Sequence, residues 1–526
     1  MEPKGYQIFV LHSHLPFVKH PEYENFLEER WLFEGVTETY LQLLLYFEQL
    51  VNEGVDFQIT MSITPALAEM FVDPVLQNRT LKYIENLVRL GESEIKRTRG
   101  DDRFYFTALH YYNRFLRQRD DFVNKYHKNL IEGFLKFKKS GHLEIITCTG
   151  PHLFLPNFQP EPSIIRMAIR VAKRNYIKHF GEEPKGIWLA ENGYFEDCDK
   201  FLADENIRYF FLETHGILYG NPKPVYGVFA PVYTPNGVAA FGRDVETAKQ
   251  VWSASEGYPG DYNYREFYRD IGFQLPMDYL KPFLPEGIRV QTGFKYYKIT
   301  GKTEDKQPYN REVARNKAAE HAGNFLFNRT KQVEYLASKM DRPPVVVSMY
   351  DAELFGHWWY EGPEFIYYLI KKMHYDQNII KMITPTNYLR KFPTNQVVMP
   401  NFSSWGYKGY SEVWLNGDVE WILYYLYDAI DKFKKITKEK NNPNPEEKRV
   451  LNQMARELLL GCASDWPFII TTKTTVEYAV KRVKEHIHNF NKLYYDLLNN
   501  YIDYEYLKEI EQKNSIFQEI DYQLWN

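Results

Sequence analysis

The stretch "EEPKGIWLAENGYFED" (182–197) shows the pattern on which the predicted fold rests. Its apolar run, Gly186 to Ala190, stops abruptly at Glu191. Short runs that are apolar on both faces are typical of strands in a parallel sheet covered by helices. A carboxylate at the tip of such a buried strand costs free energy unless its charge is used. Glu191 is therefore either a structural residue at a strand end or the nucleophile of an enzyme.

Similar runs recur along the chain, separated by amphipathic helical stretches such as "ETYLQLLLYFEQLV". Strands alternating with helices indicate βαβ units and a parallel sheet. Seven or eight such units favour a closed or nearly closed barrel over an open doubly wound sheet, because no GxGxxG motif follows the first strand. We predict strands at about 5–11, 56–62, 143–148, 185–190, 207–212, 237–242, 289–292 and 345–350.

Two regions have helical patterns without intervening strands. The segment from about 70 to 140 indicates a helical insertion between barrel strands, and from about 417 onward the chain is helical almost throughout. At 526 residues the chain is long enough for a large domain with an appended one. We expect a catalytic barrel at 1–395 and a C-terminal helical domain at 396–526.

The composition excludes several classes of function. A net charge of −4, without a cluster of Lys and Arg interleaved with aromatics, does not fit a nucleic-acid-binding protein. The three cysteines are far apart, which argues against a disulfide framework and fits a reducing compartment. No stretch is long and apolar enough for a secretion signal or a membrane span, so we expect a cytoplasmic protein.

Polar side chains follow nearly every predicted strand. In parallel α/β barrels the working residues project from the carboxyl ends of the strands, so these are the candidates for a site. One such residue means little, but their recurrence favours a functional site. They are His12, His14, His152, Glu191, Glu213, His215, Arg243, Asp244, Asp351 and Glu353.

Glu191 and Asp351 are the leading candidates for a catalytic pair. Trp188 stands near the first, and Trp358 and Trp359 follow the second. Glycoside chemistry needs a carboxylate that attacks the anomeric carbon and an acid, with its pKa raised by an apolar setting, that protonates the leaving oxygen. Spacing alone leaves this hypothesis and a structural explanation about equally supported.

A metal site is the rival chemistry. "LHSHLP" (11–16) has the HxH spacing of metal-dependent hydrolases, and His152, His215 and Asp351 could complete a site at the barrel mouth. That arrangement would fit a metal-dependent carbohydrate deacetylase or amidohydrolase. Ordinary hydrogen bonding of His12 and His14 is at least as good an explanation. The metal hypothesis leaves Glu191 and the Trp-rich flanks without a function, so it ranks second.

Other motifs carry weaker signals. Trp405 and Trp414 lie in the Ser/Gly/Tyr-rich stretch "NFSSWGYKGYSEVWLN" (401–416), where a sugar-stacking rim is slightly favoured over core packing. In "SDWPF" (464–468), an N-capping function for Asp465 is the simplest interpretation. Arg265 lies in "YREFYRDIGF" (264–273), where a salt-bridged helix start is favoured over a ligand contact.

Seven motifs in order resemble one family along nearly the whole chain. They are "VLHSHLPF", "GIWLAENGY", "GVAAFGRD", "GYPGDYNYREFYRDIGF", "MYDAELFGHWWYEG", "SSWGYKGYSEVWLN" and "LNQMARELLLGCASDWPF". The chain closely resembles glycoside hydrolase family 57, specifically its α-1,4-glucan branching enzyme subgroup, some of whose members carry the α-amylase label. This resemblance implies an incomplete seven-stranded (β/α) barrel that acts by a retaining double displacement.

The resemblance also implies functions for individual residues. Glu191 matches the nucleophile and Asp351 the general acid/base. His12, His14 and His152 match residues that line the cleft, Trp405, Trp414 and Asp465 match glucan-contacting positions, and Arg265 falls in a family motif. The family needs no metal or organic cofactor, and we expect a monomer with an α-glucan substrate.

The same resemblance leaves the outcome of the reaction open. Branching members carry a loop with a Tyr at its tip over the cleft, and here "GVFAPVYTPNGVAAFGRD" (227–244) places Tyr233 before a Pro-Asn-Gly turn. This segment is short for a lid. A branching enzyme is the leading prediction, an α-amylase or 4-α-glucanotransferase the first alternative. A non-catalytic glucan-binding protein is a further class.

Overall fold

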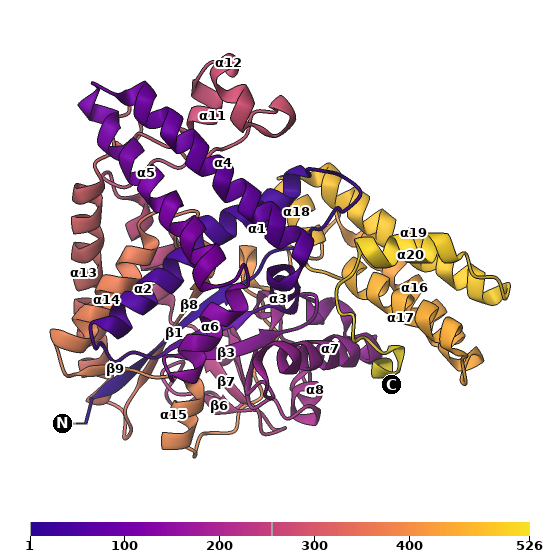
Figure 1. Cartoon of the computed structure of the whole chain (residues 1–526). Coiled ribbons are helices and arrows are strands. Elements are labelled where there is room, and N and C mark those ends of the chain that lie inside the picture. Colours follow the sequence, from indigo (N-terminus) through magenta and orange to yellow (C-terminus); the bar gives the residue numbers. More distant parts are fainter. Residues whose placement is uncertain (1, 254–255) are drawn as a thin grey trace.

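The computed structural model describes residues 2–253 and 256–526 and has a curled parallel sheet at its centre (Figure 1). Seven strands of the described residues pair in parallel in the order β7-β5-β4-β3-β2-β1-β8. The backbone N–H of Asp244, just after β7, donates to Val347 O in β8 at 2.9 Å, so the two ends of the sheet approach each other. The predicted incomplete (β/α)7 barrel is confirmed.

The strands are short, as their sequence runs predict. Their bounds are β1 (Gly5–Ser13), β2 (Ile59–Ile63), β3 (Leu143–Cys148), β4 (Gly186–Trp188), β5 (Tyr209–Leu212), β7 (Ala239–Gly242) and β8 (Val345–Asp351). Two strands were not predicted: β6 (Val232–Tyr233), antiparallel to β7, and β9 (Ile380–Met382), which pairs with β1.

The prediction of a strand at 289–292 is wrong, because this segment is a loop. The backbone N–H of Thr292 bonds to a side chain and not to a neighbouring strand. The Asp270 carboxylate accepts from the N–H groups of Thr292 and Gly293, at 2.9 and 2.8 Å. A side-chain acceptor thus satisfies backbone donors that a strand would have offered to a sheet.

Alternation along the strands decides which side chains face the barrel interior. Even-numbered residues of β1, such as Ile8 and Val10, pack in the interior cluster, and their odd-numbered neighbours pack against the helices. Since side chains alternate between faces, His12 continues the inward series of β1. In β8, Val347 and Met349 are inward, so Asp351 is also on the interior side. Alternation therefore brings the two strand-end residues to the same mouth.

Helices cover the outside of the sheet, and the predicted helical insertion is present. Thr64 and Asp73 cap the N-termini of α3 and α4, each followed by a proline at the first helical position. The long helices α4 and α5 pack against each other at one end of the molecule (Figure 1). The first helices are α1 (Arg30–Glu34), α2 (Leu41–Asn52), α3 (Pro65–Val72), α4 (Pro74–Thr98), α5 (Asp102–Asp120), α6 (Leu130–Lys139), α7 (Pro162–Phe180), α8 (Asp199–Asp204) and α9 (Thr214–Leu218).

The second half of the chain adds the remaining covering helices and a helical arm. The arm, α16 to α20, lies to one side of the barrel (Figure 1). Across residues 2–253 and 256–526, no helix combines the length and apolarity needed to cross a membrane. The helices are α10 (Val245–Trp252), α11 (Ile271–Gln274), α12 (Met277–Leu280), α13 (Arg311–Ala337), α14 (Gly362–Tyr375), α15 (Pro385–Lys391), α16 (Glu420–Glu439), α17 (Pro445–Gly461), α18 (Asp465–Thr472), α19 (Val476–Leu498) and α20 (Tyr504–Lys513).

Candidate active site

A cavity of about 1060 Å³ lies at the C-terminal ends of the strands. Residues from the barrel and from the region after residue 400 line it together. Most of the residues singled out from the sequence are in its wall, but Trp188, Glu213, His215, Tyr233 and Asp244 are not. The predicted residues that line it are His12, His14, His152, Glu191, Arg243, Arg265, Asp351, Glu353, Trp358, Trp359, Trp405, Trp414 and Asp465.

Glu191 enters the cavity from a strained turn directly after β4. Its φ of 59° and that of Asn192, 51°, are left-handed, which is uncommon for residues other than glycine and costs about 1 kcal/mol each. Trp405 Nε1 donates to Oε2 of Glu191 at 2.6 Å, and Ser464 Oγ donates to Oε1 at 2.9 Å. Both carboxylate oxygens are thereby held in fixed positions.

The environment of Glu191 has opposing effects on its proton affinity. Burial raises the pKa of Glu191 to about 7, while the hydrogen bonds from Trp405 and Ser464 stabilise the ionised form and oppose this rise. The charges of Asp465 and Asp351 also raise it. Because Asp351 affects the pKa of Glu191, the two carboxyl groups are electrostatically linked across the cavity.

Asp351 ends β8 and differs from Glu191 in its hydrogen bonding. In the described part of the chain, no group hydrogen-bonds to its carboxyl group, which lines the cavity. Burial raises the pKa of Asp351 to about 7, and the nearby charge of Glu353 raises it further, while Arg243 and His14 oppose the rise. A carboxyl group in this state can hold a proton near neutral pH and still reach a ligand.

Glu353 is another acidic residue of the cavity, and it was among the strand-end candidates, although no catalytic function was assigned to it. Its carboxylate accepts hydrogen bonds from Tyr40 Oη and from the backbone N–H of His14, the latter at 3.2 Å. Burial raises the pKa of Glu353 to about 7, against the effect of the Tyr40 hydrogen bond. Its position two residues after Asp351 made it a candidate, because both follow the same predicted strand.

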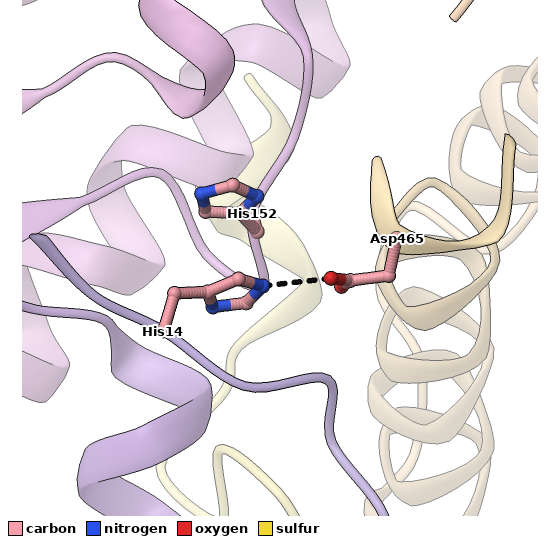
Figure 2. Close-up of side chains that lie close together, drawn as sticks. All are labelled: His14, His152 and Asp465. Atoms are coloured by element: carbon pink, nitrogen blue, oxygen red, sulfur yellow. Dashed lines mark hydrogen bonds and ion pairs between the residues drawn. The ribbon is translucent and has the colours of Figure 1, made fainter. Parts of the chain in front are cut away.

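Three histidines form a stacked group beside these acids. The rings of His14 and His152 are 3.7 Å apart and nearly parallel, at 10°. Figure 2 shows His14 directed at Asp465, which comes from the helical arm, with His14 Nε2 2.8 Å from Asp465 Oδ1. Burial alone would lower the pKa of His14, but Asp465 outweighs this effect and raises it. Asp465 therefore favours the protonated form of His14.

The other two histidines are neutral. Burial, and then the charge of His14, keep the pKa values of His12 and His152 well below the usual range. Their Nε2 atoms are 3.1 Å apart, so one ring donates to the other. His152 Nδ1 is 2.7 Å from the hydroxyl of Ser464, which in turn donates to Glu191. The histidines thus connect to the carboxylate through one serine.

His14, His152 and Asp465 have the residue types and proximity of a metal site, with one potential ligand atom from each lying within 4.8 Å of the others. Their atoms are already paired, however. His14 Nδ1 lies 3.0 Å from Thr64 Oγ1 and its Nε2 bonds to Asp465, while both nitrogens of His152 have the partners given above. Two parallel stacked rings are also unlike the radial arrangement of ligands around zinc. Hydrogen bonding therefore accounts for this cluster.

His215 and Asp351, which the metal hypothesis also used, do not join this cluster. His215 Nε2 donates to the backbone oxygen of Gly409 at 2.8 Å, and its ring lies edge-on to Tyr410. His215 is not among the residues that line the cavity. The structure therefore does not bring His215 and Asp351 together with the three histidines as one set of metal ligands.

Trp188 does not line the cavity, in contrast to its predicted contact with substrate. It is fully buried in the barrel interior, and its ring stacks on His12 at 4.5 Å and 10°. Residue 188 points inward from β4 and ends beneath His12, which covers it. Trp188 therefore supports a cavity residue.

Tyr233 also lies elsewhere, so its predicted placement at the cleft is corrected. Residues 232–242 fold into the short β6–β7 hairpin, closed by a bond from Gly237 N–H to Thr234 O at 2.9 Å. Tyr233 Oη donates to Pro393 O at 3.1 Å. The residue lines a separate cavity of about 510 Å³ that also contacts Lys185 and Arg208, just before β4 and β5, at the opposite end of the strands.

The two tryptophans of the 401–416 segment differ in exposure. Trp405 is half-buried and bonds to Glu191 through its side chain, and its backbone N–H donates to Glu191 O at 2.8 Å. Trp414 is buried and stacks on Phe154 at 4.8 Å, although an edge reaches the cavity. One is a direct partner of the carboxylate and the other a wall residue packed in the core.

Arg265 is buried in the wall and held by aromatic and polar partners. Its guanidinium carbon lies 3.8 Å from the centre of the Tyr360 ring, and its Nη1 donates to Tyr111 Oη and Gly293 O, both at 3.3 Å. It begins no helix and forms no ion pair in the described residues, unlike the salt-bridged helix start favoured from the sequence. Its cation shapes one end of the cavity.

The chain matches two family models along its length. Residues 8–400 match the model described as glycosyl hydrolase family 57, and residues 425–525 match the model of the C-terminal region of 1,4-alpha-glucan branching enzymes. It is 31% identical to a 1,4-alpha-glucan branching enzyme of Thermococcus kodakarensis, an alignment that covers 98% of this chain and 78% of that one.

Solved structures agree along nearly the full length of the chain. An alpha-amylase, AmyC, from Thermotoga maritima superposes with a TM-score of 0.93 at 41% identity, covering 99% of both chains. A branching enzyme of the same family from Pyrococcus horikoshii superposes with a TM-score of 0.89 at 31% identity, covering 99% of this chain and 97% of that one. Together with the barrel and its cavity, these matches show that the chain is an enzyme that belongs to glycosyl hydrolase family 57.

Proposed function

We propose that this enzyme is a 1,4-alpha-glucan branching enzyme, which cleaves α-1,4 links and forms α-1,6 branches by a retaining double displacement. One observation carries the proposal: two linked, buried carboxyl groups share one cavity but differ in hydrogen bonding. Glu191 has donors on both oxygens, and Asp351 has none in the described residues. The names of the relatives and the match of residues 425–525 support branching in particular.

In this mechanism Glu191 is the nucleophile. Its carboxylate attacks the anomeric carbon of an α-1,4-linked glucose, and the bond from that carbon to the leaving oxygen breaks. Asp351 gives its proton to this oxygen. Hydrogen bonds that hold a carboxylate ionised and oriented suit a nucleophile, and a raised pKa with a free carboxyl group suits an acid. The product of this step is a covalent glucosyl ester of Glu191.

The second half of the reaction reverses these functions. Asp351, now ionised, removes the proton from the 6-hydroxyl of an acceptor chain, whose oxygen attacks the anomeric carbon as the ester bond to Glu191 breaks. Retaining enzymes of this type place their two carboxyl groups about 5–5.5 Å apart. His12, His14 and His152 line the cavity beside Glu191, where a sugar hydroxyl would replace one of the present partners of their ring nitrogens.

The remaining wall residues would hold the glucan. Trp405 and Trp414 offer aromatic surface on which sugar rings can stack. The carboxylate oxygen of Asp465 that does not bond to His14 offers a hydrogen-bond acceptor. Arg265 closes one end through its buried cation. Trp188 acts indirectly in this proposal, by supporting the ring of His12.

A second candidate is an α-amylase, in which water resolves the ester. The T. maritima alpha-amylase AmyC is 41% identical, and Tyr233 of the β6–β7 hairpin lines a separate cavity, so it forms no lid over the candidate site. Transfer requires an acceptor held near attack geometry while water is excluded. The branching-enzyme model at residues 425–525 makes hydrolysis the weaker of the two.

Product analysis tests the proposal. Amylose is treated with the enzyme, and the product is then digested with an isoamylase-type debranching enzyme. Branching predicts new short chains released only by the debranching step, a shifted iodine spectrum and few new reducing ends. Glu191→Gln is the inactive control. Reducing ends that accumulate without debranchable chains would establish an amylase.

A further inference from the structure

The two walls of the cavity are unlike each other. Trp405 and Ser464 hold the carboxylate of Glu191 on one side. Another part of the wall is formed by the loop that continues from Asp351 to Trp358 and by the segment 265–268. The bond to be cleaved lies between the two carboxyl groups. The sugar bound covalently therefore belongs to the Glu191 side, and the sugar that leaves or arrives belongs to the Asp351 side.

An aromatic stack occupies the Asp351 side. The ring of Trp358 lies on that of Phe267 with centroids 4.6 Å apart and planes at 23°. Lys295 Nζ lies 4.1 Å from the centre of the Phe267 ring, and this lysine is buried. Trp358 is nevertheless 55% exposed and lines the cavity. An indole that is packed on one face and open elsewhere presents a rigid flat surface.

A buried ion pair fixes the loop that carries this stack. His357 Nδ1 bonds to the Glu38 carboxylate, and the His357 ring lies edge-on to Phe267 at 5.6 Å. Burial disfavours the charged forms of Glu38 and His357, but the opposite charge of each partner favours them. The pKa of Glu38 is therefore lowered to about 2, and that of His357 is raised. Trp358 is thus held by the ion pair of the preceding residue, His357, as well as by its own contact with Phe267.

We propose that the Trp358–Phe267 stack is the binding platform for the acceptor glucan chain. This inference rests on the proposed function and adds the place where the second substrate binds. The apolar faces of glucose rings stack on aromatic rings, and a preorganised ring loses little freedom when it binds. An acceptor bound here has its 6-hydroxyl on the side of Asp351, the group that takes its proton.

The experiment measures two steps separately: formation of the glycosyl ester on Glu191, called loading, and transfer of the sugar from that ester to an acceptor. A maltooligosyl fluoride loads Glu191 without occupying the acceptor side: the carbon–fluorine bond breaks, fluoride leaves, and the ester to Glu191 forms. The ester is then partitioned between water and added maltooligosaccharide acceptor. Fluoride release reports loading, and the ratio of transfer product to free sugar reports the acceptor site.

Trp358→Ala is expected to lower the transfer-to-hydrolysis ratio about fivefold to tenfold, since one stacking contact is lost. Fluoride release in the absence of acceptor stays within twofold of the wild type. Trp358→Phe, which retains a flat ring, recovers most of the ratio. The matched control is Phe327→Ala: Phe327 is 59% exposed on α13, also lies beneath a lysine, and is outside the cavity.

Three results would overturn the inference. They are an unchanged ratio in Trp358→Ala, an equal fall of fluoride release and transfer, and a fall of fluoride release alone, which would place the donor chain on this stack. Circular dichroism and thermal unfolding check that each variant is folded, and Trp358→Phe tests the site if the alanine variant is not. The branching proposal fails separately, if the wild type transfers sugar but forms no α-1,6 links.

Discussion

Trp405 Nε1 and Glu191 Oε2 are joined by a 2.6 Å hydrogen bond across 214 positions of sequence. The bond favours the ionised carboxylate and so lowers the pKa of Glu191, against the effect of burial. Hydrogen bonds to charged groups contribute about 1.5–3 kcal/mol. The tryptophan thus affects both the position and the charge of the candidate nucleophile.

Replacing this donor should shift the pH dependence of the reaction. Trp405→Phe removes the bond, the pKa of Glu191 rises, and the ionised form is reached only at higher pH. We expect the acidic limb of kcat/KM to move upward and the rate below pH 6 to fall about 10-fold to 100-fold. Ser464→Ala should move the same limb in the same direction. An acidic limb that stays in place or moves down would contradict this account.

Glu353→Gln should move the basic limb of the pH profile of kcat/KM. The charge of Glu353 raises the pKa of Asp351, so its removal lowers that pKa. Because the protonated acid is lost as pH rises through its pKa, the basic limb should move down by about half to one pH unit. The control is Glu304→Gln, a fully exposed carboxylate outside the cavity. An upward shift in Glu353→Gln would refute the coupling.

The two carboxyl groups can be assigned by chemical rescue. Glu191→Gly and Asp351→Ala should each lose about 10²–10⁴-fold or more of activity on amylose. Azide fills the space of the missing group when an activated α-glucosyl substrate is supplied. The first variant should give the β-glucosyl azide, from direct inversion, and the second the α-anomer, from a retained ester intermediate. NMR distinguishes the anomers, and exchanged outcomes would exchange the assignments.

Chelation tests the histidine cluster. Since its ring nitrogens are already paired within the protein, we expect EDTA dialysis to leave activity unchanged. Asp465→Asn should still lose about 10-fold, because it removes the charge that keeps His14 protonated. Elemental analysis of the dialysed protein provides a second readout. Activity lost to EDTA and restored by zinc would instead support the metal hypothesis.

Local patterns were sufficient to predict the barrel and the mouth at which the candidate residues meet. Short apolar runs and their polar ends located β1, β4 and β8, and alternation within β1 and β8 places His12 and Asp351 inward. The prediction at 289–292 failed, since the alternating β-branched residues Val290 and Thr292 resemble a strand until the Asp270 side chain that binds the Thr292 backbone is known.

The residues missed or misplaced depend on contacts that sequence spacing does not encode. Ser464 reaches Glu191 across 273 positions, and no local pattern links them. Trp188 lies beneath His12 through a stacking contact between β4 and β1, which are not neighbouring strands, and this contact hides it from the cavity. Tyr233 was placed by resemblance to a longer loop, and in this chain the corresponding segment is a tight hairpin.

The partners of Glu191 and His14 come from the region beyond residue 400, and this has a consequence for synthesis. While the ribosome is still translating that region, the barrel has its two acids but lacks Trp405, Ser464 and Asp465. A nascent or prematurely terminated chain would therefore have a Glu191 carboxylate without its hydrogen-bond donors, in a cavity that lacks part of its wall. Under the proposed function, glucan cleavage would begin only when the last quarter of the chain has been synthesised and has docked against the barrel.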